Sequence, residues 1–467
     1  MGFMRHSNAA NIQRRLSASF YCFSARETIA YLRTDVESPS LTEKVYSIVI
    51  PTRERHDVLQ YSLQTVLALP QQNVEIIVMD NCSSPETLEV VRRHEDHRIK
   101  YFRSDSRLSM SENWELGLSK VTGDYVFFLG DDDGIMPDAI AMAMRIHNWY
   151  PDKILAWKPI VWMWPTTIVE PYRNVLHMHI SKKVELRNSK ESLRKLYSYE
   201  NSFHESPGVY NAIVPMSFMR KFCSDHGKYF FSPVPDIYSG IVNSYFTDTH
   251  IYSYRPLSVW GLSKHSTGVS YSFSHLASSS VDQFHRENKK LWDAPVDETL
   301  VQSRLTEVIM ADTKIKTKQY FFPSDSSIEL NMSGVVRSMC EAATRYTSGT
   351  ERIIEEIQAV ARKNGVPANA FKIPAEFPGP QTLVNNYAMD ADRDLVSFSC
   401  YSDEKLYPTI DKLVLHVASM SVNVDSLYVQ DNSRSIQTVP LEPALAVPQE
   451  PRKGFLKAVG DLIKSKS

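Results

Sequence analysis

The sequence lacks several features that mark special classes of protein. Its 467 residues include 16 glycines, too few for a collagen-like protein or a flexible linker. Its five cysteines form no Cys-x-x-Cys pair, so we expect free thiols in a reducing compartment rather than a thiolate zinc site. No apolar run approaches the roughly 18 residues that cross a bilayer. The chain therefore does not read as a fibrous, disulfide-stapled or membrane-spanning protein.

An excess of charge of one sign is also missing. Lys and Arg number 52, Asp and Glu number 54, and the formal net charge is −2. Nucleic-acid binding rests on concentrated positive charge, so no nucleic-acid partner is expected. Hydrophobic residues make up 43% and charged residues 23%, which is typical of globular proteins. At roughly 150 residues per domain, the length predicts two to three domains.

Composition and periodicity divide the chain into four regions. Residues 1–44 form an N-terminal extension with no acid before Glu27; a loosely packed segment is favoured over an organelle transit segment. Residues 45–280 carry the strongest patterns. Residues 281–438 are predicted to be a mainly helical accessory domain, in which 381–430 are ambiguous and 412–420 fit a strand or a helix. Residues 439–467 combine a proline-rich tether with an amphipathic helix.

The C-terminal helix predicts a contact outside the core. In residues 452–464, five apolar side chains recur on one face and lysines occupy much of the other: Phe455, Leu456, Val459, Leu462 and Ile463. This pattern suits an anionic membrane surface, and docking on the protein or a partner is the alternative. We expect a cytoplasmic protein, with peripheral attachment to the inner face of a membrane and homo-oligomerisation both left open.

Strand and helix patterns alternate from residue 45 to residue 149. Strands are predicted at 45–50, 74–79, 99–102 and 124–129, and helices at 59–67, 85–94, 111–121 and 137–149. This alternation is typical of a mostly parallel sheet with helices on both faces. Ligands bind such sheets beyond the carboxyl ends of the strands. The segments that directly follow strands are residues 51–54, 80–84 and 131–133.

The last of these segments is an acidic triplet, Asp131, Asp132 and Asp133. Three adjacent carboxylates repel one another and need compensation. Mg²⁺ or Mn²⁺ would supply it, because hard oxygen ligands suit these ions and the ions also bridge to phosphate oxygens. An acidic turn before the helix near Pro137, stabilised by the helix dipole, is the alternative.

Taken in order, the motifs resemble the family 2 glycosyltransferases, which have the GT-A fold. The matching pieces are Ser47–Arg53, Ile76–Asn81 with Ser83 and Ser84, Asn113 with Gly117, Gly123–Leu129, and Asp131–Asp133 with Pro137. They cover about residues 45–145 and extend weakly to about 275. The resemblance implies an α/β fold: a GT-A-type, Rossmann-like mixed sheet, mostly parallel and flanked by helices, followed by a mainly helical C-terminal region.

The resemblance also implies roles for individual residues. The donor nucleotide would be contacted by Pro51, Thr52, Glu54, Asp80, Asn81, Asp131 and Asp132. Asp80 would accept a hydrogen bond from N3 of uracil, unless it is only a turn residue at the end of a strand. Within the DXD motif, Asp133 would bind Mn²⁺ or Mg²⁺. Many members carry an acid where Gly130 stands, so the register of the triplet on the metal is open by one residue.

A late segment around Lys264 and His265 adds weaker expectations. His265 would be a further metal ligand and Lys264 a phosphate contact, but a solvent-facing loop histidine is the favoured interpretation. Three tryptophans that are close together earlier in the sequence are expected in the core, with stacking on sugar rings as the alternative: Trp157, Trp162 and Trp164.

Inverting transfer needs a base that takes the proton of the acceptor hydroxyl. Asp236 stands at a spacing comparable to that of the family's base, although it also follows Pro235 and could simply cap a helix. Glu205, Asp225 and Asp248 are competitors with less defined surroundings.

The resemblance therefore predicts a metal-dependent inverting glycosyltransferase. It would move a sugar from a nucleotide-sugar donor, in the first place a UDP-sugar, to a hydroxyl of a glycan or lipid-linked acceptor. Two alternatives remain. A nucleotidyltransferase would usually carry a glycine-rich loop after the first strand, and Pro51–Arg55 contains no glycine. A non-catalytic nucleotide-sugar or glycan-binding module would need no base.

Overall fold

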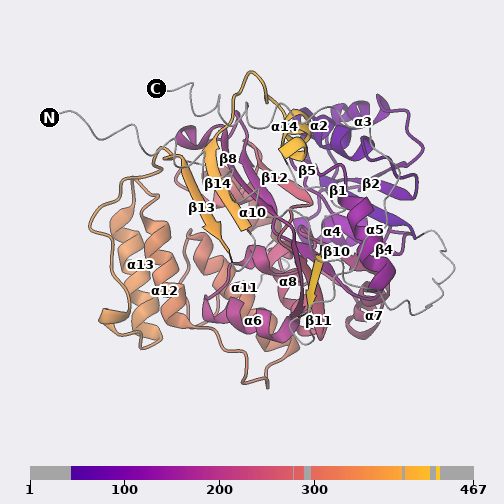
Figure 1. Cartoon of the computed structure of the whole chain (residues 1–467). Coiled ribbons are helices and arrows are strands. Elements are labelled where there is room, and N and C mark those ends of the chain that lie inside the picture. Colours follow the sequence, from indigo (N-terminus) through magenta and orange to yellow (C-terminus); the bar gives the residue numbers. More distant parts are fainter. Residues whose placement is uncertain (1–43, 277, 289–295, 392–394, 421–427, 432–467) are drawn as a thin grey trace, which may run out of the picture. The chain divides into compact units, whose positions relative to one another are not determined.

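The computed structural model describes residues 44–276, 278–288, 296–391, 395–420 and 428–431 (Figure 1). The strands are β1 (Tyr46–Thr52), β2 (Val74–Asp80), β3 (Ile99–Arg103), β4 (Tyr125–Phe128), β5 (Gly134–Ile135), β6 (Leu155–Trp157), β7 (Ile160–Met163), β8 (Val175–Ser181), β9 (Lys183–Asn188), β10 (Ala212–Pro215), β11 (Thr249–Ser253), β12 (Ser258–Leu262), β13 (Asn386–Asp390), β14 (Leu395–Tyr401) and β15 (Tyr428–Asp431). The α-helices are α2 (His56–Leu67), α3 (Pro85–Arg92), α4 (Met110–Leu118), α5 (Ala139–Trp149), α6 (Ser189–Ser198), α7 (Met216–His226), α8 (Pro235–Tyr245), α9 (Thr267–Ser272), α10 (Ser278–Asn288), α11 (Thr306–Phe321), α12 (Met332–Ala343), α13 (Thr350–Lys363) and α14 (Ile410–Met420).

The larger sheet confirms the predicted mixed, mostly parallel architecture. Its strand order is β15-β9-β11-β6-β10-β4-β1-β2-β3. The run β4-β1-β2-β3 is parallel throughout, whereas β10 is antiparallel to both β4 and β6. The strands β1 and β2 are buried along their whole length, which explains why each reads as a continuous apolar run instead of an alternating one.

Both faces of this sheet are covered by helices. Ile48 and Ile50 of β1 pack with apolar residues of α2, α5 and α14, while Val49 points to the opposite face and packs with residues of α4, α7 and α8. Trp157, Trp162 and Trp164 are buried, so the core interpretation of these tryptophans is confirmed and sugar stacking is not.

The second sheet contains strands from distant parts of the chain, in the order β13-β14-β8-β7-β12-β5. The strand β14 pairs antiparallel with the whole of β8. The helix α14, which resolves the ambiguity at residues 412–420, packs on α2. The expected helical region 281–438 is thus helical up to Lys363, where α11, α12 and α13 pack around their own apolar cluster. Its later residues return to the sheets of the preceding region.

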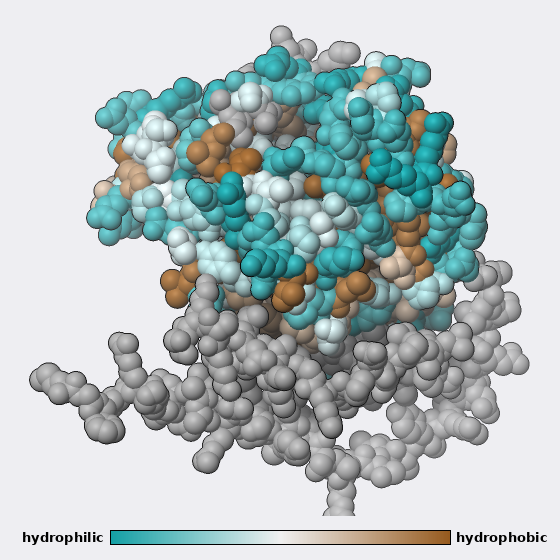
Figure 2. Space-filling model, turned by 90° about the horizontal axis from the view of Figure 1, so that it is seen from above, coloured by the Kyte–Doolittle hydropathy of each residue, from teal (hydrophilic) through white to brown (hydrophobic). Residues whose placement is uncertain are grey.

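Other predictions fall outside the described residues. They concern residues 1–43 of the N-terminal extension and the tether and amphipathic segment at 439–467. Among the described residues, no helix has the length and apolar character needed to cross a membrane. Seen from above, the surface is mainly hydrophilic, with hydrophobic residues in small separate groups (Figure 2).

Candidate functional site

Three loops that follow parallel strands meet at one edge of the larger sheet, as the sequence predicts. The loop after β1 contacts the loop after β2, where Glu54 donates its main-chain N–H to Ser83 Oγ at 2.9 Å. It also contacts the loop after β4, where Arg55 Nη1 donates to Asp131 Oδ1 at 3.0 Å. The predicted segments 51–54, 80–84 and 131–133 therefore form one cluster.

The acidic triplet lies at the centre of this cluster and is largely buried. Exposed fractions are 1% for Asp131, 6% for Asp132 and 4% for Asp133. Both oxygens of Asp133 accept main-chain hydrogen bonds, Oδ1 from Gly261 at 2.7 Å and Oδ2 from Gly130 at 3.1 Å. The side chain of Asp133 thus joins its own turn to the end of β12.

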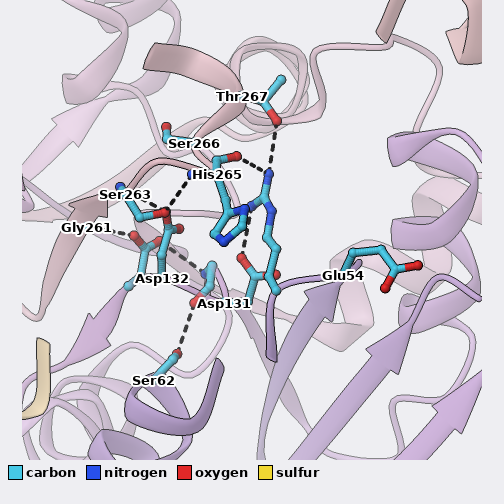
Figure 3. Close-up of polar contacts among 12 residues, drawn as sticks. Glu54, Ser62, Asp131, Asp132, Gly261, Ser263, His265, Ser266 and Thr267 are labelled. Carbon is cyan, nitrogen blue, oxygen red and sulfur yellow. Dashed lines mark hydrogen bonds and ion pairs between the residues drawn. The ribbon is translucent and has the colours of Figure 1, made fainter. Parts of the chain in front are cut away.

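Asp132 is also tied to the segment that ends β12. Its Oδ2 accepts hydrogen bonds from the main-chain N–H and the hydroxyl of Ser263, at 3.2 and 2.6 Å (Figure 3). Its carbonyl oxygen accepts a hydrogen bond from the indole of Trp164 at 3.0 Å. Trp164 therefore supports the triplet from the core rather than facing a sugar.

Two effects reduce the negative charge of the triplet: raised pKa values favour the neutral forms of Asp132 and Asp133, and Arg55 forms an ion pair with Asp131. Burial, and next the charge of Asp132, raise the pKa of Asp133 well above its ordinary value. Burial also raises the pKa of Asp132, although Arg55 opposes the shift. Burial would lower the pKa of Arg55, but the charges of Asp131 and Asp132 more than offset this and hold it above its ordinary value.

One fully buried carboxylate oxygen of the triplet is left for a ligand. Asp131 Oδ2 is buried and has no hydrogen-bond partner among the residues that the structure describes. A buried acceptor without a partner is costly, so such an atom points to a missing cation or hydroxyl donor. The free oxygen belongs to Asp131, not to Asp133, for which direct metal binding was predicted.

The two predicted metal ligands are not brought together. Both oxygens of Asp133 are taken by main-chain groups, and His265 Nε2 lies 2.9 Å from Asp57 Oδ1. Across the described part of the chain, no group of three or more His, Cys, Asp or Glu side chains is arranged to hold a metal ion. The described residues therefore offer a divalent cation single carboxylate oxygens, Asp131 Oδ2 first among them, and not a set of three side-chain ligands. The metal requirement stays a prediction.

His265 and Lys264 are held by Asp57 in the first turn of α2. Lys264 Nζ lies 2.9 Å from Asp57 Oδ2, which leaves its ammonium group paired instead of free for phosphate. The hydrogen bond from His265, together with that from Lys264, lowers the pKa of Asp57 well below its ordinary value. These contacts dock the segment after β12 onto the start of α2.

Asp80, the residue predicted to bind the uracil base of the donor, is fully buried, and both of its carboxylate oxygens already accept hydrogen bonds from the protein. Its Oδ1 accepts the main-chain N–H of Ser83 at 2.9 Å and its Oδ2 accepts the hydroxyl of Tyr101. Arg103 Nε lies 3.7 Å from Oδ2. A hydrogen bond from uracil N3 would have to share or displace these donors, and the turn-residue alternative describes the contacts of Asp80.

Of the other residues predicted to contact the nucleotide, Asn81 and Glu54 form hydrogen bonds within the protein, whereas Thr52 keeps an atom without a partner among the described residues. Asn81 exchanges two hydrogen bonds with the main chain of Leu108, at 2.8 and 2.9 Å, and so joins two loops. Glu54 accepts hydrogen bonds from the main chain of Ser84 and from Arg107, and its carboxylate points away from the triplet (Figure 3). Pro51 and Thr52 are buried at the end of β1, and Thr52 Oγ1 has no partner among the described residues, so it is free for a ligand.

Glu54 also adopts an unusual backbone conformation. Its φ is +54°, in the left-handed region that non-glycine residues rarely adopt. Such strain is kept where the surroundings impose it, often at functional sites. The contacts of Glu54 to Ser83, Ser84 and Arg107 impose it here.

Asp236, the predicted base, is the second residue of α8 and interacts with main-chain N–H groups of the first turn of that helix. Burial raises its pKa above the ordinary value. Residues 208–210 lie close both to Asp236 and to the turn that carries the triplet. A Cβ at Gly208 would lie 2.8 Å from the carbonyl oxygen of Asp236, and a Cβ at Gly130 would lie 3.3 Å from Tyr210. The charges of all three triplet residues act on Tyr210, whose pKa burial raises well above its ordinary value.

The competing acids have other surroundings. Glu205 lies 3.3 Å from Arg187 Nη1 and Asp225 lies 2.8 Å from Lys221 Nζ, while Asp248 is exposed. Asp236 thus remains the candidate base with the most suitable environment.

Sequence reasoning missed several residues that build the site: Arg55, Asp57, Tyr210, Gly261 and Ser263. Arg55 had a signal in the sequence. It follows the first predicted strand by a few residues, and a cation in such a loop can balance the charge of an acidic triplet that follows another strand of the same sheet. Gly261 and Ser263 had none, because their main-chain N–H groups and the Ser263 hydroxyl act on carboxylates more than 120 positions earlier in the chain.

Comparison with known proteins adds a family match over part of the chain. Residues 47–225 match the family described as glycosyl transferase family 2. A GalNAc(5)-diNAcBac-PP-undecaprenol beta-1,3-glucosyltransferase of Campylobacter jejuni is 32% identical over 105 residues, which are 22% of this chain and 34% of that protein. The abequosyltransferase RfbV of Salmonella typhimurium is 30% identical over 101 residues, 21% of this chain and 30% of that protein. The chain thus spans about a third of the length of these curated relatives.

Two solved structures with a partly similar course of the chain have low sequence identity to it. S. aureus TarS 1–349 in complex with UDP-GlcNAc has 12% identity and a TM-score of 0.38, covering 69% of this chain and 92% of that one. The mannosyltransferase PcManGT from Pyrobaculum calidifontis, in complex with GDP-Man and Mn²⁺, has 13% identity and a TM-score of 0.34, covering 76% and 88%.

Proposed function

We propose that the chain transfers a sugar from a nucleotide-sugar donor to an acceptor hydroxyl, because residues 47–225 match the family described as glycosyl transferase family 2. The observation that carries the proposal lies inside the matched region. Three strand-end loops converge on a buried acidic triplet in which the fully buried oxygen Asp131 Oδ2 has no partner among the described residues. That oxygen suits a ribose hydroxyl or a cation bound to the donor.

The finer proposal is an inverting reaction. The acceptor oxygen forms a bond with the anomeric carbon, the bond from that carbon to the diphosphate breaks, and the nucleoside diphosphate leaves with the electron pair. Asp236 takes the proton of the acceptor hydroxyl. Its raised pKa supports this role, because a more basic carboxylate is a better proton acceptor.

The donor is proposed to be a UDP-sugar and the reaction to depend on Mn²⁺ or Mg²⁺. Asp131 would hold the ion, which when bound neutralises charge on the departing diphosphate. For the acceptor we propose a glycan or a lipid-linked glycan, since the name of the similar Campylobacter jejuni protein contains a PP-undecaprenol carrier. Attachment to a membrane surface through residues 452–464 belongs to this proposal and suits such an acceptor.

Calorimetric titration tests the donor assignment. UDP, GDP, dTDP and CMP are each titrated into the full chain with Mn²⁺ and with EDTA. Tight binding of UDP that is lost in EDTA is expected, whereas binding of another nucleotide would change the proposed donor. Failure of all four to bind would contradict the proposal and favour a non-catalytic module.

Replacement of Asp236 separates binding from chemistry. Asp236→Asn is expected to bind UDP like the parent chain and to lose sugar transfer, measured with a UDP-sugar panel and released UDP. Turnover near the parent rate in this variant would exclude Asp236 as the base. Release of pyrophosphate by the parent chain from UTP and a sugar 1-phosphate, measured in a separate assay, would point to the nucleotidyltransferase alternative.

A further inference from the structure

Arg55 connects the acidic triplet to a segment more than 200 positions later in the chain. Its Nη1 donates to Asp131 Oδ1, and its Nη2 donates to the carbonyl oxygen of His265 and, at 3.3 Å, to Thr267 Oγ1. The three residues that accept these hydrogen bonds, Asp131, His265 and Thr267, are labelled in Figure 3. One planar group thus satisfies acceptors from two separate elements, a geometry that guanidinium provides and ammonium does not.

The contact with Arg55 decides which oxygen of Asp131 is free. Oδ1 is taken by Arg55, and Oδ2 is the buried oxygen without a partner in the described residues. A carboxylate held through one oxygen cannot rotate without breaking that ion pair, so the other oxygen keeps a constant direction. The side chain of Arg55 is 24% exposed and that of Asp131 is 2% exposed, so solvent weakens the pair little.

The same segment is bound to the triplet from its other end. Gly261 and Ser263 donate hydrogen bonds to Asp133 and Asp132. Residues 261–263 therefore hold two of the three carboxylates through main-chain and hydroxyl donors, while Arg55 holds the remaining one and the residues 265–267. The acidic triplet and this late segment form one hydrogen-bonded unit with Arg55 as its cation.

We propose that Arg55 is the positioning residue of the donor site: it orients Asp131 so that Oδ2 faces the ligand, and it fixes residues 265–267 beside it. The ligand is the ribose hydroxyl or the diphosphate-bound cation of a nucleotide sugar, so this part of the inference rests on the proposed function. Arg55 itself touches neither the acceptor nor the transferred sugar in this role.

A set of variants tests the ligand part through UDP affinity in the presence of Mn²⁺. Arg55→Gln is expected to weaken UDP binding about 10- to 100-fold, as is typical when the partner that orients a ligating group is lost. Arg55→Lys keeps the charge without the planar fork and should fall between Arg55→Gln and the parent chain. In the Arg55→Gln/Asp131→Asn double variant the losses should be far from additive, because both changes remove the same oriented oxygen.

Arg98 provides a matched control. Like Arg55, it bridges a carboxylate, that of Asp96, and main-chain carbonyl oxygens, those of Leu67 and Leu69, but it lies outside the site. Arg98→Gln should lower the melting temperature and leave the UDP dissociation constant within about threefold of the parent value. An equal loss of affinity in Arg98→Gln and Arg55→Gln would show that general destabilisation explains both, which would overturn the proposal.

Amide hydrogen exchange tests the structural part without any ligand. Exchange in residues 263–268 should accelerate in Arg55→Gln and remain at the parent rate in Arg98→Gln. Unchanged exchange in Arg55→Gln would overturn the positioning role even if UDP binds. Accelerated exchange together with no UDP binding by the parent chain would instead overturn the proposed function and leave the structural role of Arg55 standing.

Discussion

At the scale of single residues, the three carboxylates of the triplet differ in their contacts: two hold the loop in place and the third keeps a buried oxygen without a partner among the described residues. Asp133 gives both oxygens to main-chain N–H groups, and Asp132 gives one to Ser263. These bonds fold the loop that carries Asp131, whose free oxygen is then available for a ligand. Asp132 and Asp133 thus serve the structure of the loop, while Asp131 is the residue to which the proposed function gives a binding role.

Asp133→Asn should therefore act mainly on stability. In asparagine one of the two carboxylate oxygens is replaced by an NH₂ group, which donates hydrogen bonds and does not accept them. Either the N–H of Gly130 or the N–H of Gly261 would therefore lose its acceptor. We expect a loss of about 1–3 kcal/mol in the free energy of unfolding, measured by urea denaturation. The exposed Asp105 serves as control, since Asp105→Asn should change little. An unchanged unfolding free energy in Asp133→Asn would refute the structural role.

The raised pKa of Asp236 predicts how transfer depends on pH. In the proposed reaction Asp236 accepts a proton, which it can do only as a carboxylate, so activity should fall as the pH drops through the pKa of Asp236. Because burial raises that pKa, the acid limb of kcat/KM should lie above the roughly 3.9 of an ordinary aspartate. Initial rates across pH 4 to 8 check this, and a rate that stays constant down to pH 4 would contradict it.

At the scale of elements, sequence reasoning succeeded where burial is local and failed where a partner is distant. Residues 46–50 and 74–79 are buried apolar runs, and their identity as strands follows from their own composition. The strand β14 has only partly buried side chains beyond Leu395 and owes its conformation to β8, more than 200 positions earlier. No local pattern contains that information.

The candidate site divides in the same manner. The convergence of the three loops follows from parallel strand order and was predictable. The pairing of His265 with Asp57, and of Asp133 with Gly261, joins residues more than 120 positions apart. A motif identifies the residue types at a site, whereas the partner of each oxygen depends on how distant elements pack.

The contact between β5 and α14 offers a test at this scale. A Cβ at Gly134, directly after the triplet, would lie 2.6 Å from Val414 Cγ2 and 3.0 Å from Ile410 Cγ1. Gly134→Ala should therefore destabilise the protein by about 1–3 kcal/mol through overpacking. Adding Val414→Ala should recover part of this loss, as measured by urea denaturation.

Gly268 is the control for that pair of variants. The nearest atom to a Cβ at Gly268 would be Ser266 Oγ at 3.9 Å, so Gly268→Ala should not be destabilising. Strict additivity of Gly134→Ala and Val414→Ala would indicate that α14 does not press on β5.

At the scale of the whole molecule, the C-terminal elements belong to the structure that carries the site. The strand β14 pairs with all of β8, and apolar residues of α14, among them Ile410, Leu413 and Val417, lie in the same core cluster as α2. A separate accessory domain would leave the preceding region intact when removed. Here its removal would open a sheet edge and expose core residues.

A chain ending at residue 381 should consequently fail to yield stable, soluble protein. The expected result is aggregation on size-exclusion chromatography, or a melting temperature far below that of the parent chain. A chain ending at residue 431 keeps all described elements and is the reference. A cooperative transition near the parent melting temperature in the shorter chain would show that the C-terminal elements are dispensable.

The position of α14 also bears on how the protein is made. The triplet is synthesised early, but Gly134 beside it packs against Ile410 and Val414. A nascent chain on the ribosome must wait for its last tenth or so before the apolar surfaces of α2 and β5 can be covered. During that interval the unfinished chain shows hydrophobic surface, which chaperones recognise. We expect the rate of translation and the supply of chaperones to decide how much active protein a cell obtains.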